Sequence, residues 1–276
     1  MNIYAFSDEA ASSVDGQIAA IKRNDLGGTE IRGVDGQSVS SISAEKADEV
    51  LKKLKDNGLS VWSVGSPIGK IGIVGDDFDQ HLDRLRHTLE IANRLECNRI
   101  RMFSFYIPAG ETPEKYRGEV IDRLGRMVEI AKPFGVTLCH ENEKGIYGDL
   151  APRCAEILNA VPELHCIFDP ANFIQSGQDI PQAWELLGSR VDYMHIKDAL
   201  ADGSVVPAGK GIGHLPEILA DFRARGGENV TVEPHLQVFD GLAALEKDQK
   251  TKIPAYAYPS SDDAFDAACA ALRALL

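Results

Sequence analysis

Two patterns of apolar residues alternate along the chain. Short β-branched runs are typical of buried strands, and longer runs with apolar residues three or four positions apart are typical of amphipathic helices. The short runs predict eight strands, at residues 3–6, 29–34, 60–64, 99–103, 136–143, 164–168, 191–196 and 229–233. The longer runs predict a helix after each strand, at residues 14–24, 44–57, 77–95, 113–132, 151–160, 181–187, 215–225 and 262–275.

Eight strand–helix units in 276 residues are the number found in a closed (β/α)8 barrel, the TIM barrel of the α/β class. A doubly wound open sheet is the alternative. No linker, short repeat or low-complexity tract interrupts the series, so we expect one domain over residues 1–276.

The connections that follow the strands are longer and more polar than those that follow the helices. The longest span residues 65–76, 198–214 and 234–261. In a barrel they would all lie at the carboxyl-terminal face, where barrel enzymes carry their chemistry. The first and last of them could act as lids over a site.

Polar residues stand where four successive strands end. The segments VTLCHENE, CIFDPANF, VDYMHIKD and VTVEPH place Glu141, Asp169, His195 and Glu233 at equivalent positions. Because neighbouring strands lie about 5 Å apart, these side chains can converge on one ion. Three carboxylates and an imidazole suit Mn²⁺ first, with Mg²⁺, Co²⁺ or Zn²⁺ as further candidates, and a dication would relieve the repulsion between the carboxylates.

Each of these residues also has an ordinary structural interpretation. Asp169 precedes Pro170 and can cap a helix, His195 can be a hydrogen-bonded core residue, and Glu233 precedes Pro234 in the same way. The occurrence of all four at equivalent positions favours the metal site.

Composition narrows the classes of partner. The chain has 29 Lys and Arg against 42 Asp and Glu, a formal net charge of −13, which disfavours binding to nucleic acid. The five cysteines include no CxxC pair, which indicates reduced packing residues. No apolar run approaches the roughly 18 residues needed to span a membrane, and we expect a soluble, cytoplasmic protein.

The motifs FSDEA, EIRGVDG, CHENEKGIYGD, FDPANF, YMHIKDA and VEPH occur in this order over nearly the whole chain. Together they resemble the sugar phosphate isomerase/epimerase family of xylose-isomerase-like TIM barrels, which is related to ketose 3-epimerases and inosose dehydratases. The resemblance implies that Glu141, Asp169, His195 and Glu233 bind the metal and that Glu141 and Glu233 are the catalytic acid/base pair. It also implies a small sugar substrate and an enediolate intermediate. A homo-oligomer is a further possibility that the resemblance raises.

The sequence departs from the ketose 3-epimerases at two positions. The histidine that stands three residues after their aspartate ligand is Asn172 here, and the arginine six residues after their histidine ligand is Ala201. Lys197 and Asp198 follow His195 instead. Both departures bear on which substrate the site accepts.

Further polar residues lie near the strand ends and are candidates for substrate binding or for support of the ligands. These candidates are Glu9, Arg32, Arg101, Glu143, Lys144, Asn172, Lys197 and His235. For Glu9, Arg32 and Arg101, salt bridges between loops are an equally good interpretation.

Several other residues favour structural roles. Trp62 and Phe103 are expected in the core more than under a sugar ring, and the GKGIG run at residues 209–213 reads as a flexible turn because it lacks the spacing of a phosphate loop. His81 and His87 are expected to be solvated on the third helix.

Three functions are consistent with these residues. The first is a divalent-metal-dependent isomerase or epimerase of a small sugar or keto-sugar. The second is a lyase or dehydratase of the inosose dehydratase type that uses the same intermediate, and the third is a barrel that binds sugars without turnover.

Overall fold

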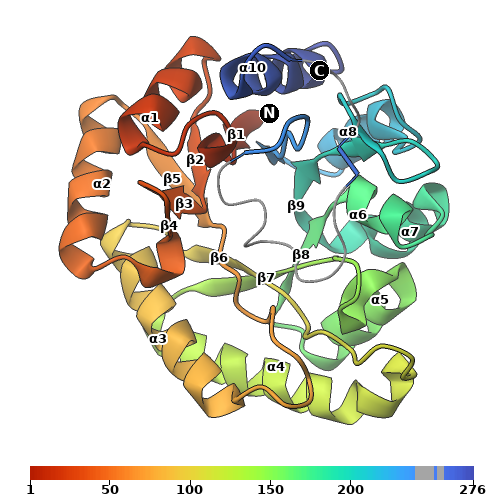
Figure 1. Cartoon of the computed structure of the whole chain (residues 1–276). Helices are drawn as coiled ribbons and strands as arrows, with labels where there is room; N and C mark the ends of the chain where they lie inside the picture. The colour runs from red at the N-terminus through yellow and green to blue at the C-terminus, as the bar shows by residue number, and fades with distance from the viewer. Residues whose placement is uncertain (240–251, 254–257) are drawn as a thin grey trace.

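Eight parallel strands form a closed barrel in the computed structural model, which describes residues 1–239, 252–253 and 258–276. The strands close in the order β1-β12-β9-β8-β7-β6-β5-β2, and helices surround them (Figure 1). Their bounds are β1 Asn2–Ala5, β2 Gly28–Ile31, β5 Ser60–Val64, β6 Arg99–Met102, β7 Thr137–Glu141, β8 His165–Phe168, β9 Val191–Ile196 and β12 Asn229–Val232. The predicted single-domain TIM barrel is confirmed.

The outer layer consists of amphipathic helices whose apolar faces pack on the barrel. They are α1 Val14–Arg23, α2 Ala44–Asp56, α3 Phe78–Arg94, α4 Arg117–Ala131, α5 Ala151–Ala160, α6 Pro170–Gln175, α7 Ile180–Leu187, α8 Leu215–Ala224 and α10 Ser261–Arg273. Side chains cap several of their first turns; Ser13, Ser43 and Asp77, for example, each accept a hydrogen bond from a backbone N–H three residues later.

Two predicted elements differ from the structure. The run at residues 29–34 divides into β2 and a small hairpin of β3 Gly33–Val34 and β4 Gln37–Ser38, because Asp35 and Gly36 both have positive φ and turn the chain. The helix predicted at residues 113–132 begins as a 3₁₀ turn at Pro113–Tyr116, and α4 starts only at Arg117. A second hairpin, β10 Asp198–Ala199 with β11 Val205–Val206, lies within the loop after β9.

The inside of the barrel changes from apolar to charged along its axis. Near the amino-terminal end of the strands, Cys139, Ile167 and Tyr193 form a small buried cluster that Trp62 covers. Glu141 and His195 follow two residues after Cys139 and Tyr193, and therefore point to the same inner face. The barrel thus carries its buried charges at the carboxyl-terminal end.

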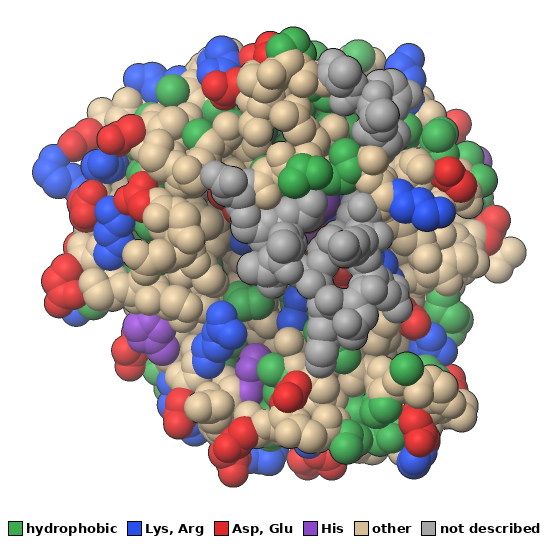
Figure 2. Space-filling view, viewed as in Figure 1, with side chains coloured by type: hydrophobic (Ala, Val, Ile, Leu, Met, Phe, Trp, Pro, Cys, Tyr) green, Lys and Arg blue, Asp and Glu red, His purple; other side chains and the backbone are tan. Residues whose placement is uncertain are grey.

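The cysteines and the helices can be compared with the sequence predictions. All five cysteines are buried and unpaired, as predicted. In the described part of the chain, none of the helices is both long and apolar enough to cross a membrane. On the face seen in Figure 2, the described acidic and basic side chains are interspersed around the rim.

Candidate metal centre

Four strand ends bring Glu141, Asp169, His195 and Glu233 together. Glu141 is the last residue of β7 and His195 lies near the end of β9, while Asp169 and Glu233 directly follow β8 and β12. All four side chains are buried, and one ligand atom from each lies within 4.8 Å of the ligand atoms of the others. Parallel pairing places these ends side by side, which is why the sequence could predict their convergence.

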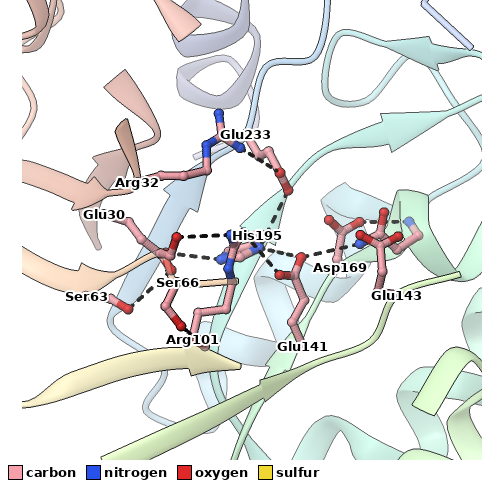
Figure 3. Close-up of polar contacts among 12 residues, drawn as sticks. Glu30, Arg32, Ser63, Ser66, Arg101, Glu141, Glu143, Asp169, His195 and Glu233 are labelled. Carbon is pink, nitrogen blue, oxygen red and sulfur yellow. Dashed lines mark hydrogen bonds and ion pairs between the residues drawn. The ribbon is translucent and has the colours of Figure 1, made fainter. Parts of the chain in front are cut away.

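His195 stands at the middle of this group (Figure 3). Its Nδ1 atom lies 2.9 Å from Glu141 Oε1 and 3.6 Å from Glu233 Oε2. Its Nε2 atom lies 3.1 Å from Glu30 Oε2. Burial disfavours the charged imidazole, but Glu141 and Glu30 outweigh this and raise the pKa of His195 to about 10.

Glu30 is a site residue that the sequence reasoning missed. It is fully buried in β2, where Tyr193 Oη donates to Glu30 Oε1 at 3.0 Å and Ser63 Oγ donates to the same oxygen at 3.2 Å. A metal ion binds the neutral ring; in that form the Nε2–H of His195 donates to Glu30 Oε2, and the Nδ1 lone pair faces Glu141 and Glu233. Such a carboxylate–histidine arrangement orients the imidazole in metal sites. A glutamate in the middle of a buried strand was the available signal.

The crowding of three carboxylates around one imidazole supports a cation at the centre. Glu141 Oε2 and Asp169 Oδ2 are buried without a hydrogen bond of normal geometry. Burial, together with the charges of Glu233 and Glu141, outweighs the attraction of Lys197 and raises the pKa of the Asp169 carboxyl to about 7. Three crowded carboxylates and one oriented imidazole fit a divalent cation such as Mn²⁺.

Lys197 reaches into the same group from the end of β9. Its Nζ atom lies 2.9 Å from Asp169 Oδ2 and 2.9 Å from Glu233 Oε2. Burial disfavours the ammonium, but Asp169 and Glu233 outweigh it and raise the pKa of Lys197 above its usual value. The side chain is therefore a charged hydrogen-bond donor and not a free amine nucleophile.

Arg32, Glu9 and His235 form a second charged group next to Glu233. Arg32 Nη2 lies 3.0 Å from Glu9 Oε1, and its Nη1 lies 3.5 Å from Glu233 Oε1. His235 Nδ1 lies 3.0 Å from Glu9 Oε1, and its backbone N–H donates to Glu9 Oε2 at 2.7 Å. Burial raises the pKa of Glu9, but His235 and Arg32 outweigh this and hold it below its usual value. These salt bridges join loops at the rim of the site.

Arg101 and Asn172 contact Glu141 directly. Arg101 Nη1 lies 3.3 Å from Glu141 Oε2, and its guanidinium lies over the ring of Phe6 at 4.8 Å. Asn172 Nδ2 donates to Glu141 Oε1 at 3.3 Å and to the Asn142 carbonyl at 3.0 Å. Both residues hold the glutamate in place.

Glu143 and Lys144 lie further out. Glu143 Oε2 pairs with Lys70 at 3.0 Å, and Lys144 Nζ donates to Gln175 at 3.1 Å. Burial raises the pKa of Glu143, but Lys70 and Lys197 outweigh this and lower it to about 2. The Lys70 contact ties the loop at residues 65–76 to the end of β7.

The family of the chain follows from its sequence as a whole. A model of the xylose isomerase-like TIM barrel family matches residues 18–251. The chain belongs to this family. No curated protein sequence matches it significantly.

Solved structures of other xylose isomerase-like barrels share the fold at low identity. The probable 3-DHS dehydratase AsbF of Bacillus anthracis has a TM-score of 0.74 at 18% identity, over 99% of this chain and 98% of that one. The IolI protein with a binding zinc atom has a TM-score of 0.76 at 14% identity, over 100% and 98% of the two chains. D-Psicose 3-epimerase of Clostridium cellulolyticum H10, solved with D-tagatose, has a TM-score of 0.73 at 16% identity, over 99% and 97%.

Several predictions about single residues of this xylose isomerase-like barrel can now be judged. The prediction that His81 is solvated is wrong. Its ring is buried, and its Nε2 accepts a hydrogen bond from the Gly69 N–H at 2.8 Å. Burial lowers the pKa of His81 to about 4. His87 is half-buried, with Nε2 lying 2.9 Å from the Ile42 carbonyl oxygen. Trp62 stacks on Tyr4 at 5.1 Å, which confirms a packing role.

The prediction that the GKGIG run at residues 209–213 is a flexible turn is also wrong. The N–H groups of Gly209, Gly211 and Gly213 each donate to the Asp198 carboxylate at 2.9 Å, so an internal anion holds this loop. Most of the segment at residues 234–261, which was considered as a lid, lies outside the described residues.

Proposed function

We propose that this protein is a divalent-metal-dependent isomerase or epimerase of a small sugar or keto-sugar. The observation that carries the proposal is the pair of buried glutamates, Glu141 and Glu233, on either side of His195. In this proposal Glu141, Asp169, His195 and Glu233 hold the ion, with Mn²⁺ as the first choice. The bound ion supplies positive charge to the oxygens of an enediolate.

The side chains supply the proton transfers. One glutamate removes the proton next to the substrate carbonyl, and the other returns a proton to the opposite face. Arg101 and Asn172 keep Glu141 oriented, and Arg32 does the same for Glu233. Lys197, which stays charged, donates to a substrate oxygen on which negative charge develops.

The remaining polar groups suit a neutral polyol. Glu9, Glu143, Lys144 and His235 line the rim, and each is already paired with an opposite charge or a polar group. Among the described cations, Arg32, Arg101 and Lys197 are each paired with a carboxylate, whereas an anionic substrate would require cations of its own. The rim therefore favours hydroxyl groups over an anionic substrate.

A dehydratase is the second candidate, and the arrangement around His235 favours it. His235 Nδ1 lies 3.0 Å from Glu9 and 3.7 Å from Glu233, so a proton donor stands beside one of the two proposed bases. Such a donor could protonate a leaving hydroxyl after the first proton is removed. The ketose epimerase pattern at Asn172 and Ala201 is absent, which also leaves this chemistry open.

Turnover in deuterated water tests the proposal. The Mn²⁺-loaded protein is incubated with ketoses, inososes and 3-keto-glycosides, and the products are followed by NMR. Deuterium at an inverted or isomerised carbon is expected; an unsaturated product would favour the dehydratase. Glu141→Gln and Glu233→Gln should each lower turnover by about 10²–10⁴-fold at saturating Mn²⁺. Glu143→Gln is the matched control and should keep the metal content.

Absence of bound metal in the protein under metal-replete conditions would contradict the proposal. Tight sugar binding without any product, unaffected by Glu141→Gln, would instead indicate a barrel that binds sugars without turnover.

A further inference from the structure

A second group of metal-ligand side chains lies at the opposite end of the barrel from the candidate metal centre. It consists of Cys139 on β7, His165 at the start of β8 and Asp192 near the start of β9. Cys139 is the register partner of His165. The proposed function uses none of these three residues.

A β-bulge brings Asp192 into this group. Along β8 and β9, Cys166 pairs with Val191 and Ile167 pairs with Tyr193, so Asp192 is the extra residue in the ladder. Strict alternation would point it away from the inner face that carries Tyr193, and the bulge turns it toward β8 instead. Asp192 Oδ2 lies 3.1 Å from His165 Nδ1 and 3.2 Å from Arg99 Nε.

The three side chains form a compact set of ligands. One ligand atom from each lies within 4.8 Å of those of the other two. Around a tetrahedral Zn²⁺ with bond lengths of about 2.0–2.3 Å, ligand atoms are about 3.5 Å apart, so small rotamer changes suffice. We propose that Cys139, His165 and Asp192 bind a thiophilic divalent cation, Zn²⁺ or its substitute Co²⁺, with water as the fourth ligand.

This site differs chemically from the centre at the carboxyl-terminal end. A thiolate ligand selects Zn²⁺ over Mn²⁺ or Mg²⁺, whereas the three carboxylates of the other group suit the harder ions. Binding replaces the proton of the Cys139 thiol, which is released to solvent, and no electron transfer is needed.

The exposure of the three residues provides a path for the ion. The side chain of His165 is 44% exposed and that of Asp192 is 23% exposed, whereas Cys139 is fully buried. The ion would enter from the amino-terminal face past His165. Arg99, which now shares Asp192, lies over the Trp62 ring at 4.4 Å and can keep that contact when the carboxylate turns to the metal.

A bound ion would link three adjacent strands. β7, β8 and β9 are the strands whose far ends carry or precede Glu141, Asp169 and His195. Since the unfolded chain lacks this preformed site, ligation should raise the thermal midpoint of the protein as the Zn²⁺ concentration rises.

Absorption of Co²⁺ tests the site in the full-length protein. A thiolate ligand produces a near-ultraviolet charge-transfer band, and the candidate centre at the other end has no sulfur ligand to produce one. We expect the band in the wild type and its loss in Cys139→Ser. His165→Gln, a change at a partly exposed residue, should weaken Co²⁺ binding at least about tenfold. His87→Gln is the matched control and should leave binding unchanged.

The absence of the band in the wild type at millimolar Co²⁺ would overturn the proposal, and so would its persistence in Cys139→Ser. If Cys139→Ser does not fold, His165→Gln decides, because unchanged Co²⁺ affinity in that variant, read from the charge-transfer band, excludes the site. Retained Mn²⁺ binding in His165→Gln would show that this result is independent of the other centre.

Discussion

Replacement of Glu30 by Gln tests whether a buried carboxylate orients the metal-binding histidine. Glu30 Oε2 lies 3.1 Å from His195 Nε2, and Oε1 accepts from Tyr193 and Ser63. Glutamine has nearly the same shape and can keep the neutral contacts, so the change removes mainly the charge. The substitution therefore separates electrostatics from packing.

The expected magnitude follows from this geometry. At an effective dielectric constant of about 20, two unit charges 3.1 Å apart attract by about 5 kcal/mol, which is the full attraction when both groups are charged. His195 binds a metal as a neutral ring, so only part of this energy is at stake. Loss of such a supporting carboxylate typically costs about 10–100-fold in metal affinity, or about 1.4–2.8 kcal/mol. We expect that loss for Mn²⁺.

Titration of the purified protein with Mn²⁺, followed by calorimetry, measures the effect. Tyr193→Phe is the matched control, because it removes the 3.0 Å hydrogen bond to Glu30 but keeps the carboxylate. It should change Mn²⁺ affinity less than about threefold. Equal affinity in wild type and Glu30→Gln would refute the reasoning, and an equal loss in Tyr193→Phe would assign the effect to packing.

Three further predictions concern stability, each measured by urea unfolding. With a chelator present, the raised pKa of His195 stabilises the fold fully below its unfolded pKa of 6.5, and this stability is lost as pH rises toward its folded pKa of about 10. The free energy of unfolding should fall by at most about 5 kcal/mol. A constant urea midpoint over this pH range would contradict the pKa shift. Gly69→Ala should cost more than about 3 kcal/mol, since its Cβ would lie 2.0 Å from the Phe103 carbonyl oxygen. Gly75→Ala, also at positive φ but in open space, should cost only about 1–2 kcal/mol, and similar losses in both would exclude the clash. Asp198→Asn should cost about 2–4 kcal/mol, because each carboxylate oxygen accepts two backbone N–H groups and an amide nitrogen cannot accept them; an unchanged midpoint would mean that these bonds add nothing.

The fold could be predicted from the sequence because each strand and helix has its own repeat of apolar residues, which is visible within a short segment. The runs at residues 60–64, 151–160 and 191–196 match β5, α5 and β9 residue for residue. The convergence of Glu141, Asp169, His195 and Glu233 was also accessible, since parallel strands of similar length must bring their ends together.

The remaining features depend on contacts that no local pattern encodes. Glu30 looks like an edge or surface residue until β2 and β9 are placed on opposite sides of one interior, where it meets His195. The bulge at Asp192 leaves no mark in an otherwise regular alternation. His81 lies on a helix with many charged residues, and only the loop folded over it, through the Gly69 N–H, explains its burial.

The buried charges of the barrel also bear on how it folds. If the barrel is divided between β6 and β7, four of its buried ion pairs join one half to the other. These pairs are Arg101 with Glu141, Arg32 with Glu233, Glu30 with His195, and Glu9 with His235.

Each half alone would lose these four pairs, and Glu30 and Arg101 would lose their ion-pair partners His195 and Glu141 altogether. An uncompensated buried ion costs several kcal/mol. Half-barrels of this chain should therefore not fold as independent units. Closure of the barrel and assembly of the site are then a single cooperative event. A circularly permuted chain keeps all eight strands and should therefore fold, whereas a fragment that lacks half of the strands should not.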